Sequence, residues 1–177
     1  KGIIKGRYTI FGKNPDKIWE FNNNSCYKYD DKKNKIKING RPKNIIEKII
    51  DEFKFKIPKN LPPISSLLSG YFSYDIIRYV ENIPNSCKDD LKIPDSRIIR
   101  PRTLIIHDNL KKKIYFIINC FADEKIRDYS KKYLKIRDEI KYLIFLANYK
   151  SNIQSIKTSK KISIKSNISK KKFLTNV

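Results

Sequence analysis

Short apolar runs alternate with clusters of turn-forming residues over the first part of the chain. Residues 7–11 and 17–21 have the β-branched and aromatic character of strands, and the segment from Gly12 to Asp16 predicts a tight reversal between them. Two further strands are predicted at 26–29 and 35–38, followed by a turn at Asn39-Gly40. The pattern therefore indicates a strand meander.

A helical spacing of apolar residues follows the meander. Pro42 precedes a stripe with an i, i+1, i+4 spacing, which predicts a helix that covers one face of the sheet: Ile45, Ile46, Ile49, Ile50 and Phe53. Further on, Asp75 is placed to cap a short helix with Ile76, Ile77 and Val80 facing inward. Arg78 and Glu81 then lie on its surface and either pair with each other or with Asp75, or stabilise an interface with another domain or subunit.

The strongest strand signal lies in the second half of the chain. Residues 98–107 and 113–121 are nearly continuous in β-branched and aromatic residues, and the polar segment 108–112 separates them, which predicts a central hairpin. Residues 124–148 repeat apolar side chains at intervals of three and four, which predicts the longest helix with a core-facing stripe. Together these elements predict an α+β fold with a mostly antiparallel sheet packed with helices.

The composition is strongly basic, with a formal net charge of +22. Of the 40 basic residues 32 are Lys, whereas Arg is the residue that specific nucleic-acid sites favour. Lys, Ile and Asn are abundant and Ala occurs only twice, as an A+T-rich coding sequence would produce, so we interpret most of this charge as a solvated surface and expect no nucleic-acid partner. A small basic module that binds polyanions remains the non-enzymatic alternative.

Other features exclude several classes of site. No apolar run is long enough to span a membrane and no signal peptide is recognisable, so a cytoplasmic protein is expected. Cys26, Cys87 and Cys120 are odd in number and form no C-x-x-C pair, which favours reduced, packed thiols over a disulfide scaffold or a zinc site. His107 can be interpreted as a general base, but with no nucleophile beside it a hairpin-end residue is the preferred interpretation.

The segment from Gly70 to Pro84 carries the most specific pattern, Gly-Tyr-Phe-Ser-Tyr-Asp-Ile-Ile-Arg-Tyr-Val-Glu-Asn-Ile-Pro. It resembles the "GY-x-x-YD-x-x-R-x-x-E-x-LP" segment of the large subunit of anthranilate synthase (component I), with Ile83 in place of the usual Leu. The motif positions, which we expect to be structural, are Gly70, Tyr71, Tyr74, Asp75, Arg78, Glu81 and Pro84.

Further matches follow in the same order along the chain. The run from Gly6 to Asp16 is similar to the family's "GRYS" opening, Leu61-Pro62-Pro63 precedes the Gly70 block, and Ile93-Pro94-Asp95 and Arg100-Pro101 resemble its "LPD" and "RP" positions. The resemblance spans roughly residues 6–121, with a weaker echo at 166–177. It implies three parts: an N-terminal domain of component I at 1–149, a basic linker at 150–168, and the truncated start of a chorismate-binding domain at 169–177.

The resemblance also implies a function for the parent protein. Members of the family convert chorismate and ammonia to anthranilate and pyruvate in tryptophan biosynthesis, using Mg²⁺ and ammonia from a glutamine amidotransferase subunit. L-tryptophan commonly inhibits them, and by resemblance Arg7 could engage its carboxylate and Tyr8 could line its pocket. A core Tyr and a strand-surface Arg are equally good interpretations of these two residues.

No catalytic, cofactor-binding or metal-binding residue is assigned, because no cluster of carboxylates with an adjacent base can be assembled from this sequence. The chain lacks Met, which favours a fragment of a longer enzyme, inactive on its own, that supplies scaffold and part of the tryptophan pocket. Aminodeoxychorismate synthase, of the folate branch, shares many of the matched positions and remains the alternative within the family.

Overall fold

A computed structural model describes residues 6–29, 33–53, 56–84, 86, 88–124, 126–149 and 165–176. The chain divides into two compact units, one reaching to Ala147 and the other beginning at Asn148. The predicted domain bounds at 149 and 168 stay a prediction.

The first unit is built on one six-stranded sheet in which every strand pair is antiparallel. The strand order is β3-β2-β1-β5-β4, and β6 pairs with the free part of β5. The strands are β1 (Tyr8–Asn22), β2 (Ser25–Tyr29), β3 (Lys35–Ile38), β4 (Ser69–Phe72), β5 (Ser96–Asp108) and β6 (Lys113–Ile118). The predicted α+β fold with a mostly antiparallel sheet is confirmed.

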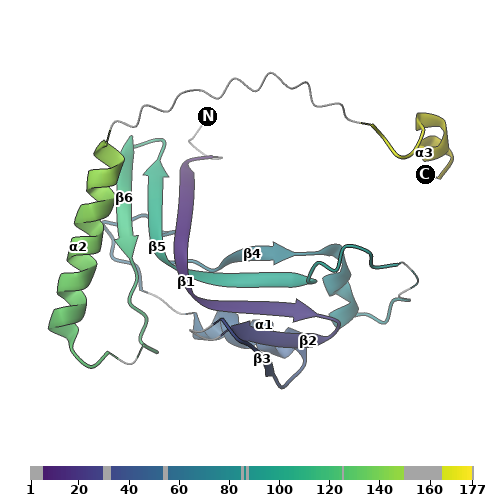
Figure 1. Cartoon of the computed structure of the whole chain (residues 1–177), viewed down its shortest axis with the longest axis horizontal. Helices are drawn as coiled ribbons and strands as arrows, with labels where there is room; N and C mark the ends of the chain where they lie inside the picture. The colour runs from purple at the N-terminus through teal and green to yellow at the C-terminus, as the bar shows by residue number, and fades with distance from the viewer. Residues whose placement is uncertain are drawn as a thin grey trace. The chain divides into compact units, whose positions relative to one another are not determined.

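The two long strands β1 and β5 run side by side and bend together, so one sheet has two differently oriented parts (Figure 1). Strand β5 pairs with β1 along one edge, and with β4 and then β6 along the other. The predicted hairpin of 98–107 and 113–121 is present, although β6 ends at Ile118. The hairpin was predicted to lie centrally: this is confirmed for its first strand β5, whereas β6 pairs with β5 alone among the described strands and lies at an edge.

The predicted reversal between Gly12 and Asp16 is wrong, because β1 continues through it as one strand. The turn-forming residues produce a bulge instead: the register with β5 shifts between Pro15 and Lys17, and Asn14 has a positive φ of 52°. Strand β5 is 13 residues long and pairs with both halves of β1, so long-range pairing overrides the local turn preference.

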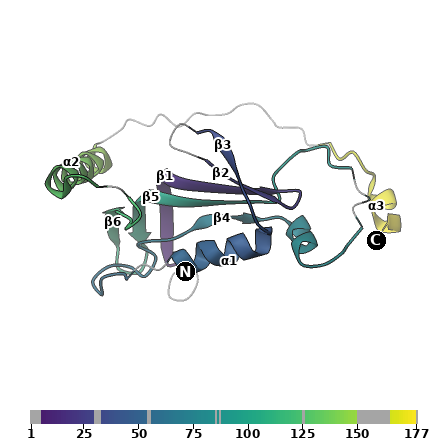
Figure 2. The ribbon, with the colours of Figure 1, turned by 90° about the horizontal axis from the view of Figure 1, so that it is seen from below.

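Helix α1 (Pro42–Glu52) begins at Pro42, as predicted, and packs its stripe on the lower part of the sheet (Figure 2). Ile45 and Ile49 form a buried cluster with Phe21, Cys26 and Ile98.

Burial raises the pKa of the Cys26 thiol to about 11, so this residue is a packed, protonated side chain. Cys120 is a free thiol too but is exposed, contrary to expectation, and Cys87 lies outside the described residues.

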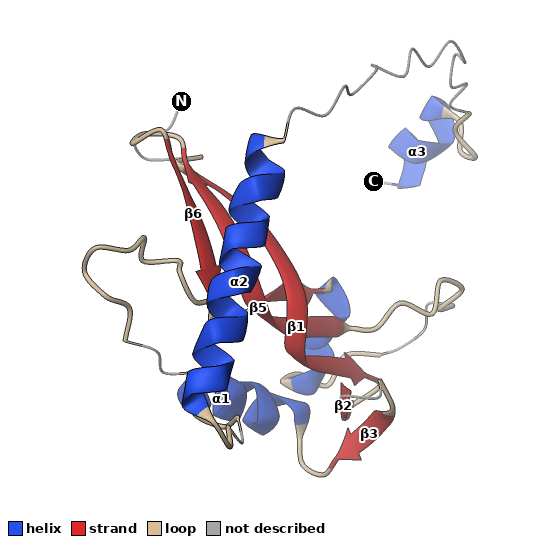
Figure 3. Cartoon of the chain, turned by 60° about the vertical axis from the view of Figure 1, so that its left-hand side comes forward, coloured by secondary structure: helices blue, strands red, loops and turns tan. Residues whose placement is uncertain are grey.

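Helix α2 (Tyr129–Asn148) runs alongside β5 and β6 (Figure 3). It begins five residues later than predicted, because the carboxylate of Asp128 accepts the N–H of Lys131 at 3.0 Å and so caps the helix there. Thr103 of β5 donates to Glu139 of α2 at 3.4 Å. Of the described residues of α2 only Leu143 is fully buried, and Tyr129 and Tyr133 of the predicted core stripe are exposed. The stripe is therefore core only near its centre.

Two short helices complete the described residues. η1 (Tyr74–Tyr79) is a 3-10 helix preceded by Ser73, and Val80 after it is exposed rather than inward-facing as predicted. α3 (Lys170–Asn176) belongs to the second unit, and Ser169 caps it, because Ser169 Oγ accepts the N–H of Lys172 at 3.3 Å. No helix in these described ranges is both long and apolar enough to cross a membrane.

Candidate functional site

Arg7 lies just before β1 and is held by Asp108 at the end of β5. Its Nε and Nη2 donate to the two carboxylate oxygens at 3.2 and 2.9 Å, and its guanidinium lies 4.8 Å from the ring centroid of Tyr8. The Asp108 side chain is only 1% exposed and also accepts the N–H groups of Leu110 and Lys111. The Arg7 guanidinium, more than these N–H groups, lowers the pKa of Asp108 to about 2.

The predicted effector residues are therefore neighbours, and each already has a structural role. Two of the nitrogens of Arg7 are committed to Asp108, which leaves Nη1 for a bound carboxylate. The register of β1 with β5 places Tyr8 opposite Asp108. The pairing thus closes one end of the long β1–β5 ladder, whether or not a ligand binds beside it.

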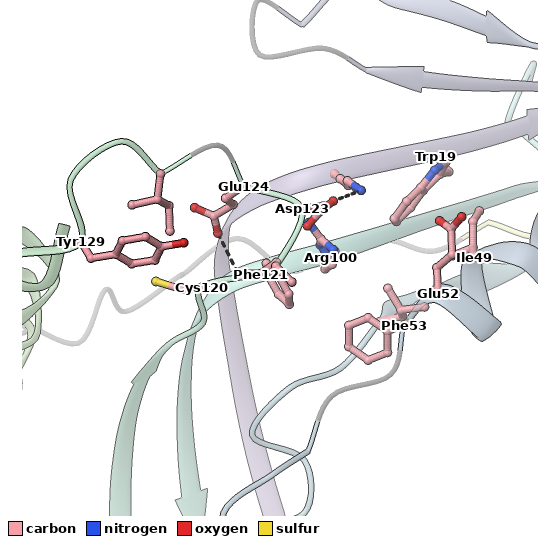
Figure 4. A pocket seen from close by; sticks show the side chains of 14 residues that line it. Trp19, Ile49, Glu52, Phe53, Arg100, Cys120, Phe121, Asp123, Glu124 and Tyr129 are labelled. Atoms are coloured by element: carbon pink, nitrogen blue, oxygen red, sulfur yellow. Dashed lines mark hydrogen bonds and ion pairs between the residues drawn. The ribbon is translucent and has the colours of Figure 1, made fainter.

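A cavity of about 640 Å³ lies near the bulge of β1 (Figure 4). Residues from α1, β1, β5 and the segment between β6 and α2 line it. Its walls combine aromatic rings with charged groups: Trp19, Phe53, Phe121 and Tyr129 together with Lys17, Glu52, Arg100, Asp123 and Glu124. A site of this size and character is typical of small-molecule pockets.

A partly buried ion cluster centred on Arg100 lies at this cavity. Arg100 Nε donates to Asp16 at 2.9 Å and its Nη2 to Asp123 at 3.0 Å, and the guanidinium lies 3.7 Å from the Phe121 ring centroid. Its side chain is 10% exposed. Burial lowers the pKa of Arg100, but the two carboxylates outweigh that effect and hold the pKa above its usual value.

The other charges of the wall are paired as well. Lys17 pairs with Asp123. Glu124 forms two ion pairs, one with Arg102 at 3.0 Å and one with Lys132 at 3.1 Å. Burial raises the pKa of Glu124, but the Phe121 N–H and the Lys132 ammonium together bring it below its usual value. The charged side chains of the wall are therefore matched to one another, and together with the aromatic rings they form a surface that can bind a ligand.

This ion cluster was not predicted. The sequence patterns place Arg100 in an Arg-Pro motif, and Asp16 in a predicted turn at the end of the "GRYS" opening. The available signal was an Arg close to the Ile-rich part of a predicted central strand, since a charge that is buried there must find a partner. The partners are Asp16, at the bulge of β1, and Asp123, in the segment between β6 and α2, and the local sequence around Arg100 specifies neither.

The predicted structural motif lies at the other end of β5. Gly70 and Tyr71 are in β4, opposite Ile98 and Arg97. Arg78 of η1 pairs with Asp75 at 2.8 Å and donates to the carbonyl of Pro84 at 2.6 Å, whereas Tyr74 and Glu81 are exposed. The structural interpretation of the Asp75–Arg78 pair is supported. The structure does not bring the motif together with Arg7 and Tyr8, because the two groups lie at opposite ends of β5.

The described residues do not fit a metal ion, since no group of three or more His, Cys, Asp or Glu side chains among them could hold one. His107 lies within β5, opposite Thr9 of β1 and Ile114 of β6, at the hairpin position that was preferred for it.

Several known proteins similar to this chain are named anthranilate synthase component 1. A protein named anthranilate synthase component 1 from Acetivibrio thermocellus is 32% identical over 178 residues, which cover 97% of this chain and 35% of that protein. A protein of the same name from Cereibacter sphaeroides is 33% identical over 122 residues, which cover 64% of this chain and 23% of that protein. No family model matches the chain. The chain spans about a third or less of the length of these relatives.

A solved structure supports the fold. The crystal structure of anthranilate synthase component I from Streptococcus pneumoniae TIGR4 covers 84% of this chain with a TM-score of 0.65, at 20% sequence identity. The match spans 31% of that chain. At this identity the likeness establishes the α+β fold.

Proposed function

Because the chain belongs to the anthranilate synthase component I family and corresponds to its N-terminal region, we propose that it is part of an enzyme that forms anthranilate and pyruvate from chorismate and ammonia. The observation that carries the proposal is the 32% identity to the Acetivibrio thermocellus protein along 97% of the chain. The parent protein is then a lyase of tryptophan biosynthesis.

In this proposal the 177 residues supply scaffold, and the chemistry belongs to the rest of the parent. The pairing of the cavity's charged side chains with one another supports this division. Mg²⁺ would bind in the remaining part, and a glutamine amidotransferase subunit would deliver ammonia. No step of the reaction is assigned to a residue of this chain.

The regulatory part of the proposal concerns Arg7 and Tyr8. L-tryptophan would place its carboxylate on Nη1 of Arg7, while Nε and Nη2 remain on Asp108 and fix the guanidinium plane. Arg7→Gln in the parent enzyme is then expected to weaken inhibition by tryptophan and to leave the uninhibited rate unchanged. A matched change of an exposed cation, Lys48→Gln, tests whether loss of positive charge alone has that effect.

The decisive experiment uses the polypeptide encoded by the complete reading frame that contains these residues. Purified parent protein is incubated with chorismate, ammonium and Mg²⁺, and anthranilate is measured by fluorescence and pyruvate by a coupled assay. Formation of both supports the proposal. Formation of aminodeoxychorismate without anthranilate would move the protein to the folate branch, and no conversion of chorismate would reject both enzymes.

A further inference from the structure

The segment around β4 and η1 exposes apolar side chains that a solvated loop would not expose. Strand β4 lies at the margin of the sheet, and η1 follows it as a short helical turn (Figure 2). Tyr74 is 91% exposed, Val80 66% and Phe72 58%, and Ile83 is exposed too. We call these four residues the β4–η1 surface. Several large apolar groups on one segment are typical of a binding surface.

The polar side chains of the same segment are used to fix its own backbone. Arg78 donates to Asp75 and to the carbonyls of Ile83 and Pro84, at 2.8, 2.9 and 2.6 Å. The Tyr79 hydroxyl donates to the carboxylate of Asp95 at 2.6 Å, and the same carboxylate accepts the N–H of Asn23. The backbone carbonyl of Asp95 accepts the N–H of Ser73. The apolar side chains are therefore presented on an ordered backbone, which lowers the entropic cost of binding.

The composition of this segment differs from that of the rest of the chain. Residues 60–87 contain no Lys, although 28 residues would hold about five at the chain's average frequency. From Ser69 to Asp95 there are five acidic and three basic residues, in a chain of net charge +22. Since Lys is abundant on the solvated surface elsewhere, its loss here needs a local reason. The segment is depleted in Lys and enriched in Tyr, with three Tyr in 28 residues, and both are compositional marks of an interface.

We propose that the β4–η1 surface binds the part of the parent polypeptide that lies outside these 177 residues. This inference rests on the proposed function, because it takes the parent to be as long as its relatives, of which this chain covers 35% and 23%. An apolar surface on a preformed backbone fits a permanent contact within one protein better than a transient one.

The exposed groups define the chemistry of the partner surface. The partner surface has an apolar pocket that accommodates the ring of Tyr74 and covers Phe72, and Lys or Arg side chains lie at the rim of that pocket. Glu81 is exposed beside these residues, and Asp89 and Asp90 follow it along the chain, so a basic rim matches the local excess of carboxylates. A second copy of this chain and a separate subunit are the other possible occupants, and the test distinguishes them.

Tyrosine nitration tests the surface directly. The isolated 177-residue chain and the parent protein are treated with tetranitromethane, and modification of Tyr74 is followed by peptide mass spectrometry. We expect Tyr74 to react about tenfold more slowly in the parent, because a covering partner excludes reagent and water. Equal rates in the two proteins would overturn the proposal. Slowing that depends on the concentration of either protein, or on added amidotransferase, would assign the surface to a second copy or to that subunit and would also overturn it.

Substitution gives an independent readout. Tyr74→Lys is expected to leave the thermal midpoint of the isolated chain unchanged, since the side chain is exposed there, and to lower that of the parent. The matched control Leu110→Lys changes an exposed apolar residue of the turn between β5 and β6 and should leave both midpoints unchanged. A parent midpoint that is insensitive to Tyr74→Lys contradicts the proposal.

Anthranilate formation by the same preparation tests the proposed function separately from the interface. A parent that forms anthranilate while Tyr74 reacts freely keeps its function and loses this interface. A parent in which Tyr74 is protected but no anthranilate forms keeps the interface and loses the proposed function. A reading frame that ends at Val177 overturns both.

Discussion

Gly70 is the residue at which the sheet leaves the least room for a side chain. A Cβ at this position would overlap the carbonyl oxygen of Arg97 and lie 3.0 Å from the Cα of Ile98, both in the neighbouring strand β5. Backbone atoms within a ladder cannot move aside as a flexible side chain can. The lack of a Cβ at Gly70 therefore allows β4 to approach β5 closely.

Gly70→Ala is expected to destabilise the chain by about 2–3 kcal/mol, because one methyl group must separate β4 from β5. Urea denaturation followed by the fluorescence of Trp19 measures it. Gly12→Ala is the control, since a Cβ there would meet side-chain atoms of Pro101 at 3.1 and 3.4 Å, a tight contact with atoms that can shift. A midpoint for Gly70→Ala equal to that of Gly12→Ala would show that the strands separate freely.

The Arg7–Asp108 pair should make the stability depend on acid pH. The folded state lowers the pKa of Asp108 from about 3.8 to about 2, so its contribution is complete above pH 4 and is lost as the pH falls through 2. Arg7→Gln removes the main cause and should move acid unfolding to a higher pH. Unfolding is followed by Trp19 fluorescence between pH 5 and pH 1.5.

Asp89→Asn serves as the control for that titration, because Asp89 is an exposed carboxylate on a loop. It should leave the acid midpoint where the wild type has it. An acid midpoint for Arg7→Gln that is the same as the wild-type value would mean that the pair contributes nothing to acid stability.

Helix α1 shows how an element is fixed by its pattern of apolar residues. The i, i+4 pair Ile45 and Ile49 is buried against the sheet, whereas Ile50, on the other flank of the stripe, is 58% exposed. The sequence predicted the helix and its first residue correctly. It could not tell which Ile would be covered, because that depends on how the helix is oriented on the strands.

Ile49→Ala and Ile50→Ala form a matched pair that tests this burial. The first should cost about 2–4 kcal/mol because it leaves a cavity in the core, and the second less than about 0.5 kcal/mol. Urea midpoints of the two variants give the difference. Similar costs at both positions would mean that α1 covers the sheet with a different face.

The strands and α2 show where pattern alone was insufficient. The residues from Gly12 to Asp16 favour a turn, yet a continuous partner strand keeps β1 extended and turns their preference into a bulge. Helix α2 has the apolar repeat of a core helix, yet most of its apolar side chains remain exposed in the described part of the chain. Both results depend on what lies beside the element, which the local sequence does not encode.

At the scale of the whole molecule, the described residues hold a fold and a charged cavity but no assembled catalytic group. The charged side chains of the cavity wall are in ion pairs, and no metal-binding group occurs among the described residues. A dianionic substrate would find no unpaired cation in the wall.

We expect the isolated 177-residue chain to form no anthranilate from chorismate, ammonium and Mg²⁺, while the parent protein does. Anthranilate fluorescence at equal molar concentrations of the two proteins measures this. A thermal unfolding scan of the same sample ensures that the isolated chain is folded. Turnover by the folded 177-residue chain would place the catalytic groups within it and refute the division proposed above.

The sequence by itself determined the family, the α+β class, the helix from Pro42 and the central hairpin, because these depend on local periodicity and on motifs in fixed order. Only the tertiary structure decided the continuity of β1, the partners of Arg7 and Arg100, the cavity, and the exposure of Tyr74. Each of these requires residues far apart in the chain to meet: Arg7 and Asp108 are 101 positions apart, and Asp16 and Arg100 are 84 apart. Such pairings follow from the bend and register of the long strands, which no local pattern specifies.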